Sequence, residues 1–312
     1  MTNMKKLGLT ALAGSLVATS AYAGELAVSG TTKLTYASQH DTETTGNPYS
    51  MNKGIGFSGS GDLDNGMAIA YQYTMTDAAF SSSSLKLDMG DTGTLSFSNG
   101  AGTTGISAYD DKMPTAGEEV WDDLDGQANG VATISNKGTI GYAGSFGPVG
   151  VSASYNKDDK ATPNAVAGSS HSLVVSMSPA DGVTAFIGTG DKSGSTANNG
   201  TDMYTAGVTY TAGAFTLGFQ TTDIDVSAVN GDTDRNHLAA SFAVNENMSI
   251  SYGMSTVGFE DPAKVDQEDA GVAVSYTMGS MTLGAFRNTS DDVGGTASAE
   301  DSVTEVSLAF AF

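Results

Sequence analysis

Apolar and polar residues alternate along most of this chain in short segments. Between residues 25 and 38, Leu26, Val28, Leu34 and Tyr36 share one parity, and polar residues occupy the other. Alternation with a period of two indicates a strand with one apolar and one polar face. The pattern recurs and predicts sixteen strands. They span roughly residues 25–38, 51–63, 66–76, 83–90, 92–98, 137–145, 148–157, 170–179, 182–190, 201–211, 214–223, 234–244, 247–258, 269–278, 281–289 and 302–312.

The connections between these segments alternate in length. Short ones contain tight-turn residues. They lie at residues 64–65, 90–91, 146–147, 180–181, 212–213, 245–246 and 279–280. The longer, polar ones span residues 39–50, 77–82, 99–136, 158–169, 191–200, 224–233, 259–268 and 290–301. An even number of strands with short turns on one rim and longer loops on the other predicts an all-β, antiparallel transmembrane barrel.

A soluble β-sandwich is the alternative fold, because apolar and polar residues also alternate along its strands. In this chain, however, the polar parity consists of small uncharged residues, and Tyr and Phe recur near segment ends, as in the aromatic girdles of membrane barrels. The last segment places Leu308, Phe310 and Phe312 on one face and ends at the aromatic residue. Such an ending resembles the assembly signal of bacterial outer-membrane proteins and favours the barrel.

Composition narrows the class of protein. Residues 1–23 begin with Lys5 and Lys6, continue with an apolar run and end in Ala21-Tyr22-Ala23, which predicts a secretory signal peptide cleaved before Gly24. No apolar run approaches the ~20 residues of a membrane-spanning helix. The absence of cysteine excludes disulfides and cysteine–zinc sites. A net charge of −22 disfavours nucleic acid as a partner. Residues 24–312 are therefore expected to form one exported barrel domain.

The whole mature chain resembles the trimeric general porins of alphaproteobacteria. The resemblance rests on the signal peptide followed by residues 25–30, ELAVSG, on the terminal Phe312, and on the long insertion after the fifth strand. It implies a homotrimer in the lipid and lipopolysaccharide of the bacterial outer membrane, delivered by periplasmic chaperones and the barrel-assembly machinery. It also implies a diffusion pore for small hydrophilic solutes, without a cofactor, in which the third outer loop bends inward.

The insertion at residues 99–136 is the expected constriction of that pore, since a sixteen-stranded barrel keeps an aqueous channel. Trp121 is expected to anchor the loop to the wall. Rings of carboxylates favour cations, so we expect a cation preference. The predicted constriction acids are Asp110, Asp111, Glu118, Glu119, Asp122, Asp123 and Asp125. The alternatives are a solvated surface loop and a Ca²⁺ site, because Ca²⁺ prefers oxygen ligands, although no EF-hand spacing is present.

Basic residues are few, so their parity is informative. Lys33, Lys86 and Lys137 fall on the lumenal parity of their segments and are the expected basic wall opposite the acidic loop. An alternative role for the first two is a solvated lysine paired with a nearby acid such as Asp88. Arg235 has lumenal parity near the outer rim. Lys53 and Arg287 have outward parity, where they would extend toward the membrane surface.

A barrel with an enzymatic role, or an adhesive or structural one, is the remaining alternative. An outer-membrane hydrolase needs a positioned base, usually His, beside a nucleophile. His40, His171 and His237 lie outside any hydrolase or metalloprotease motif and are expected to be rim or loop residues. Phe186 and Phe286 are the only bulky aromatic residues placed on the inner parity, too few for the aromatic slide expected of a substrate-specific barrel. The sequence therefore favours a non-enzymatic diffusion channel.

Overall fold

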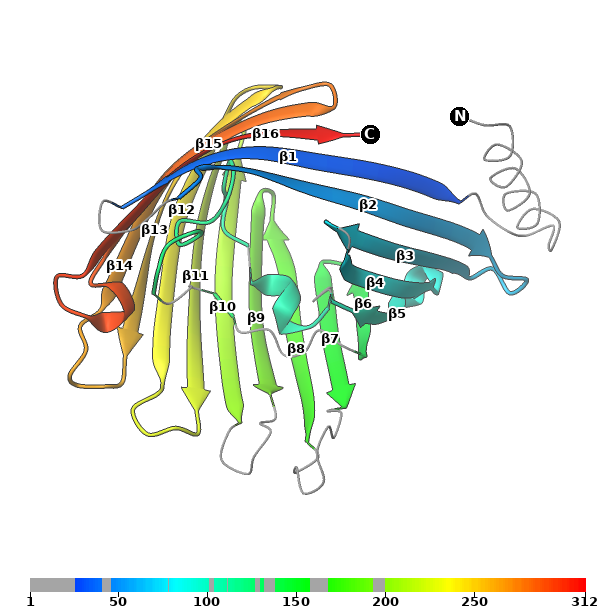
Figure 1. Cartoon of the computed structure of the whole chain (residues 1–312). Coiled ribbons are helices and arrows are strands. Elements are labelled where there is room, and N and C mark those ends of the chain that lie inside the picture. The colour runs from blue at the N-terminus through cyan, green and yellow to red at the C-terminus, as the bar shows by residue number, and fades with distance from the viewer. Residues whose placement is uncertain are drawn as a thin grey trace.

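The computed structural model describes residues 26–40, 46–77, 79–100, 104–110, 112–126, 130–131, 138–157, 168–192 and 200–312. These residues form a closed barrel of sixteen antiparallel strands (Figure 1). The strands are β1 (Ala27–Gln39), β2 (Tyr49–Asp62), β3 (Ala68–Thr76), β4 (Ala79–Asp88), β5 (Thr94–Asn99), β6 (Thr139–Phe146), β7 (Val149–Lys157), β8 (Ser169–Ala180), β9 (Val183–Lys192), β10 (Thr201–Ala212), β11 (Phe215–Val226), β12 (Thr233–Asn245), β13 (Met248–Phe259), β14 (Gln267–Met278), β15 (Met281–Asp291) and β16 (Glu300–Ala311). The sequence-based prediction of the fold is confirmed.

Each strand pairs with its neighbours in sequence, and β1 pairs with β16 to close the barrel. The short 3₁₀ helices η1 (Gly90–Thr92), η2 (Ile106–Tyr109) and η3 (Val293–Gly295) lie in connections. Among the described residues, no helix is long and apolar enough to cross a membrane. The predicted signal peptide, residues 1–23, lies outside the described residues.

The two parities of the strands separate an apolar outer face from a polar inner face. On β13, Ile250, Tyr252 and Met254 are exposed on the outside, whereas Ser251 and Ser255 are buried on the inside. A closed barrel satisfies all backbone hydrogen bonds between strands, which is what a bilayer requires, so the apolar face suits contact with lipid. The predicted orientation of the two parities agrees with the structure.

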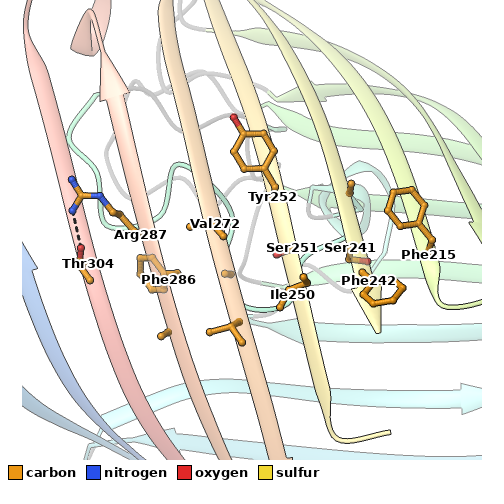
Figure 2. Close-up of a pocket in the computed structure, with 14 residues that line it drawn as sticks. Phe215, Ser241, Phe242, Ile250, Ser251, Tyr252, Val272, Phe286, Arg287 and Thr304 are labelled. Atoms are coloured by element: carbon orange, nitrogen blue, oxygen red, sulfur yellow. Dashed lines mark hydrogen bonds between the residues drawn. The ribbon is translucent and has the colours of Figure 1, made fainter. Parts of the chain in front are cut away.

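A mainly apolar groove of about 540 Å³ runs over β11–β16 on this outer face. Phe215, Phe242 and Tyr252 line it, and Arg287 lies at its edge (Figure 2). The Arg287 guanidinium donates a hydrogen bond from Nη1 to Thr304 Oγ1 at 3.0 Å. Lys53, the other basic residue predicted to face outward, pairs with Asp77 at 3.0 Å.

One predicted connection is wrong. Residues 77–82 were expected to form a long loop, but β3 ends at Thr76 and β4 begins at Ala79, so only two residues connect them. The run Ser81–Ser84 places serine on both faces of β4, which removes the apolar–polar alternation from this half of the strand. The register also shifts between Thr74 and Met75.

The chain end pairs with the first strand. The Phe312 amide donates to Gly30 O at 2.8 Å, and the Gly30 amide donates to Phe312 O at 3.1 Å. Leu308, Phe310 and Phe312 share one face, and the rings of Phe310 and Phe312 are stacked with centroids 6.5 Å apart. The residues predicted as an assembly signal therefore lie at the seam where the barrel closes.

Candidate pore constriction

The described residues between β5 and β6 enter the barrel interior and lie along its inner wall (Figure 1). We call residues 104–110, 112–126 and 130–131 the constriction segment. At its start, the amides of Gly105 and Ile106 donate to Ser152 Oγ on β7 at 2.8 Å and to Ser172 Oγ on β8 at 2.9 Å. These bonds occupy two backbone donors that a loop folded into the barrel would otherwise leave unpaired.

An apolar cluster holds the first turn of the segment against the wall. Ile106 is fully buried and packs with Val131, and the wall contributes inner-face residues of β8–β11. These wall residues are Val174, Phe186, Met203 and Ile224. The ring of Tyr109 lies 4.9 Å from that of Phe186, and Gln220 Nε2 donates to Tyr109 O at 2.9 Å. Phe186 therefore belongs to the apolar cluster that anchors the loop.

Glycines on the wall let the middle of the segment approach closely. A Cβ at Gly218 would lie 2.5 Å from Pro114 Cδ, and one at Gly253 would lie 2.7 Å from Val120 Cγ1. A side chain at either position would force the loop to shift, so glycine allows this close approach. Between them, the Ala116 amide donates to Ser251 Oγ at 2.8 Å.

Trp121 packs against His237 on β12. The two rings meet edge to face with centroids 4.7 Å apart, and only 9% of Trp121 and 5% of His237 are exposed. Trp121, the residue expected to anchor the loop, therefore packs against the wall. The expectation that His237 is a rim or loop residue is wrong, because it lies buried on the inner face of the wall beneath the loop.

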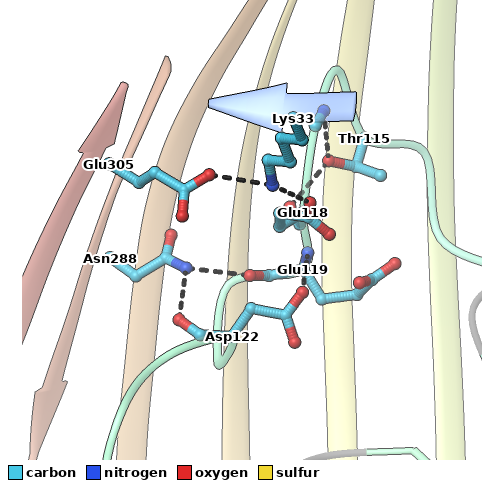
Figure 3. Close-up of polar contacts among 8 residues, drawn as sticks. Lys33, Thr115, Glu118, Glu119, Asp122, Asn288 and Glu305 are labelled. Carbon is cyan, nitrogen blue, oxygen red and sulfur yellow. Dashed lines mark hydrogen bonds and ion pairs between the residues drawn. The ribbon is translucent and has the colours of Figure 1, made fainter. Parts of the chain in front are cut away.

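The last part of the segment is tied to β15 and β16. Asn288 Nδ2 donates to the carbonyls of Glu119, at 2.9 Å, and Asp122, at 3.1 Å (Figure 3). The Asp125 amide donates to Asp301 Oδ2 at 2.6 Å. Leu124 packs on a small apolar cluster that contains Phe286. The segment is therefore fixed to the wall from β7 to β16.

An acidic cluster lies on this fixed part of the segment. Glu118, Glu119 and Asp122 each place a carboxylate oxygen within 4.8 Å of the others. Lys33 Nζ, from β1, lies 3.2 Å from Glu118 Oε1 and 2.9 Å from Glu305 Oε1 (Figure 3). Since Lys33 lies between two carboxylates, its positive charge is already compensated.

Asp122 differs from its acidic neighbours in burial. Its Oδ2 accepts a hydrogen bond from the Glu119 amide at 3.1 Å. Burial raises the pKa of Asp122 above its ordinary value of 3.8, hydrogen bonds with Glu119 oppose this rise, and the charges of Glu118 and Asp123 add to it. Asp122 is therefore expected to take up a proton at a higher pH than an ordinary aspartate does.

A sequence model of Gram-negative porins matches residues 8–310. The chain belongs to the Gram-negative porin family. Similar solved structures include an anion-selective porin from Comamonas acidovorans, with a TM-score of 0.67 and 17% identity over 93% of this chain and 100% of that one. Mutants of the Rh. blastica porin match with a TM-score of 0.63 and 14% identity over 92% and 100% of the two chains. OmpT of Vibrio cholerae lacking loop L8 matches with a TM-score of 0.68 and 14% identity over 93% of this chain and 99% of that one. No curated protein sequence gives a significant match.

Membership of this family and the barrel fold place the porin in the outer membrane. The structure brings Glu118, Glu119 and Asp122 together, with Asp123 and Asp125 exposed on the same part of the segment. Asp110 lies apart from them at the base of the loop, where its Oδ1 accepts the Val131 amide at 2.6 Å. Asp111 and Lys137 lie outside the described residues.

The basic residues of the porin have different environments. Lys86 is exposed on the inner face of β4 and makes no ion pair with the described residues. Arg235 faces inward, as predicted, and its Nη1 donates to Gly130 O at 3.1 Å, which supports the loop base. Sequence reasoning did not single out Glu305, Asn288 or Asp301. Polar residues of inner parity are common in this chain, and only the path of the loop distinguishes these three.

Proposed function

We propose that this porin is a general diffusion channel for small hydrophilic solutes and ions, with a preference for cations. The observation that carries the proposal is the acidic cluster on a loop segment fixed inside the barrel, beside a lysine already compensated by Glu118 and Glu305. A ring of carboxylates at a narrow point raises the local concentration of cations.

Charge selectivity does not follow from the fold. The similar porin from Comamonas acidovorans is described as anion-selective, although its barrel superimposes on this one. Selectivity must therefore come from the side chains at the constriction. The excess of acids over bases there favours cations in this chain, and screening by salt limits the effect to ~8 Å at physiological ionic strength.

The experiment is the current through single refolded channels in a planar bilayer under a salt gradient. We expect stepwise conductance and a reversal potential of the sign for cation preference. A correctly folded barrel without conductance would exclude the channel and return attention to an enzymatic or adhesive barrel. Conductance with an anion-selective reversal potential would contradict the proposed preference alone.

A homotrimer is part of the same proposal and is tested separately. Mass measurement by light scattering in detergent is expected to give three chains per particle, and current closures are expected to occur in threes. A monomeric particle that conducts in single steps would contradict the trimer and leave the channel intact. Removal of Phe312 is expected to reduce insertion into the outer membrane, since the assembly machinery is expected to recognise the terminal strand.

Calcium binding at Glu118, Glu119 and Asp122 is a further proposal from the sequence. The three carboxylates supply oxygen ligands, which Ca²⁺ prefers, and converge closely enough to share an ion. Titration of the purified barrel with Ca²⁺ by calorimetry, with Glu119→Gln as the variant, tests this proposal. The absence of heat in the wild type would refute it.

A further inference from the structure

A bowl of about 670 Å³ lies in the lumen beside the first turn of the constriction segment, against β5–β10. Its wall residues lie near the strand ends joined by short turns, such as Ser145 before the β6–β7 turn and Thr184 after the β8–β9 turn. Short turns face the periplasm in outer-membrane barrels. The bowl is therefore the periplasmic vestibule of the pore, separate from the acidic cluster near β15 and β16.

Side-chain hydroxyls dominate the polar lining of the bowl. Ser152 already accepts the Gly105 amide at 2.8 Å. Five others make no side-chain hydrogen bond within the described part of the chain. They are Thr94, Ser145, Ser176, Thr184 and Thr209. Each hydroxyl can both donate and accept, so this wall can pair with the hydroxyls of a solute.

One charged side chain lines the bowl among the described residues. Lys112 Nζ lies 5.2 Å from the centroid of the Tyr109 ring and forms no ion pair with a described carboxylate. Contact with the face of this partly buried ring leaves the three N–H donors of Lys112 available. Asp110, two residues earlier, is directed to Val131 at the loop base. The chain has a net charge of −22, so a vestibule lined by a lysine and hydroxyls differs in charge from the chain as a whole.

We propose that this bowl is a binding subsite for small hydroxylated carboxylates, with the carboxylate at Lys112 and the solute hydroxyls on the serines and threonines. The subsite would let an anionic solute dwell on the periplasmic side of a constriction that favours cations. The inference rests on the proposed function, because the bowl opens into the pore. An anion without hydroxyl groups would leave the serines and threonines of the bowl unpaired. A neutral sugar would leave Lys112 without a carboxylate.

The test is isothermal titration of the refolded barrel with gluconate, acetate and glucose. We expect gluconate to bind more tightly than the other two. Lys112→Gln is expected to weaken gluconate binding about fivefold, the value of an exposed charge-assisted contact of roughly 1 kcal/mol. Lys86→Gln, which removes the same charge from the inner wall outside the bowl, is the matched control and is expected to leave binding unchanged.

Thr184→Val and Thr209→Val provide a second arm, since both lie on barrel strands and do not depend on the loop. Each is expected to weaken gluconate binding while acetate binding is unaffected. Equal binding of acetate and gluconate, equal effects of the two lysine variants, or no heat with gluconate would each overturn the subsite. Conductance is measured on the same samples: channels that conduct but do not bind gluconate refute the subsite alone, whereas loss of all conductance refutes the channel.

Discussion

Lys33 on the first strand and Glu305 on the last lie 2.9 Å apart beside the seam that closes the barrel. Glu305 is only 6% exposed, and Lys33 also reaches Glu118 on the constriction segment at 3.2 Å. A single ammonium group therefore links the two ends of the barrel sheet to the loop. This link compensates a buried carboxylate, which would otherwise be costly in free energy.

Replacing Lys33 with Met is expected to have two effects. The unpaired Glu305 should lower the free energy of unfolding by about 1–3 kcal/mol, less than for a fully buried pair because Lys33 is partly exposed. The freed charge of Glu118 should increase cation selectivity. Denaturant unfolding and reversal potentials measure the two effects. Lys33→Met with Glu305→Gln should recover most of the stability, and failure to recover it would contradict the pairing.

Neutralising the acidic cluster is expected to reduce cation selectivity. In Glu118→Gln/Glu119→Gln/Asp122→Asn, each removed charge should lower the cation-to-anion permeability ratio on the order of twofold at low salt, and less at high salt. The measurement is the reversal potential at two ionic strengths. The matched control is Asp64→Asn/Asp181→Asn/Glu246→Gln, which removes three exposed acids from the short turns. Equal loss in the two triple variants would show that net charge, rather than the cluster, sets selectivity.

Lowering the pH is expected to reduce cation selectivity, and Asp122 contributes to this loss. Its pKa is raised above 3.8 by burial, so it becomes neutral at a higher pH than an ordinary aspartate. A raised pKa in the folded state means that this group favours folding below its unfolded pKa and that the contribution is lost as the pH rises through the folded pKa. Asp122→Asn should remove the contribution of Asp122 to the selectivity titration and slightly stabilise the loop at neutral pH. An unchanged titration curve in this variant would refute the assignment.

Trp121→Ala is expected to detach the constriction segment and leave the barrel folded. The substitution removes the edge-to-face contact with His237 and most of the area that Trp121 buries, and large cavities of this kind cost about 3–5 kcal/mol in protein cores. Single-channel conductance should rise and become noisier, with lower selectivity. The strand content by circular dichroism should be unchanged. Trp121→Phe, which keeps a ring in the site, should lie close to the wild type; if both variants conduct as the wild type does, Trp121 is not an anchor.

The sequence was sufficient for the strands and for the place of the insertion, because alternation is imposed by lipid on one side and water on the other. Observed strand ends lie within four residues of the predicted ones. The pattern failed at residues 77–82, where serines on both faces hide β4. It also could not indicate that His237 and Asn288 lie under the loop, since a polar residue of inner parity looks the same whether it meets water or a folded segment.

The link between Lys33, Glu118 and Glu305 also has a consequence for the order of folding. The three groups belong to the first strand, the central insertion and the last strand, so they lie together only after the two ends of the sheet have paired. The ion pairs of Lys33 are therefore late contacts, which form when the cylinder is sealed. Until that moment, Glu118 and Glu305 would carry carboxylate charges that Lys33 does not compensate.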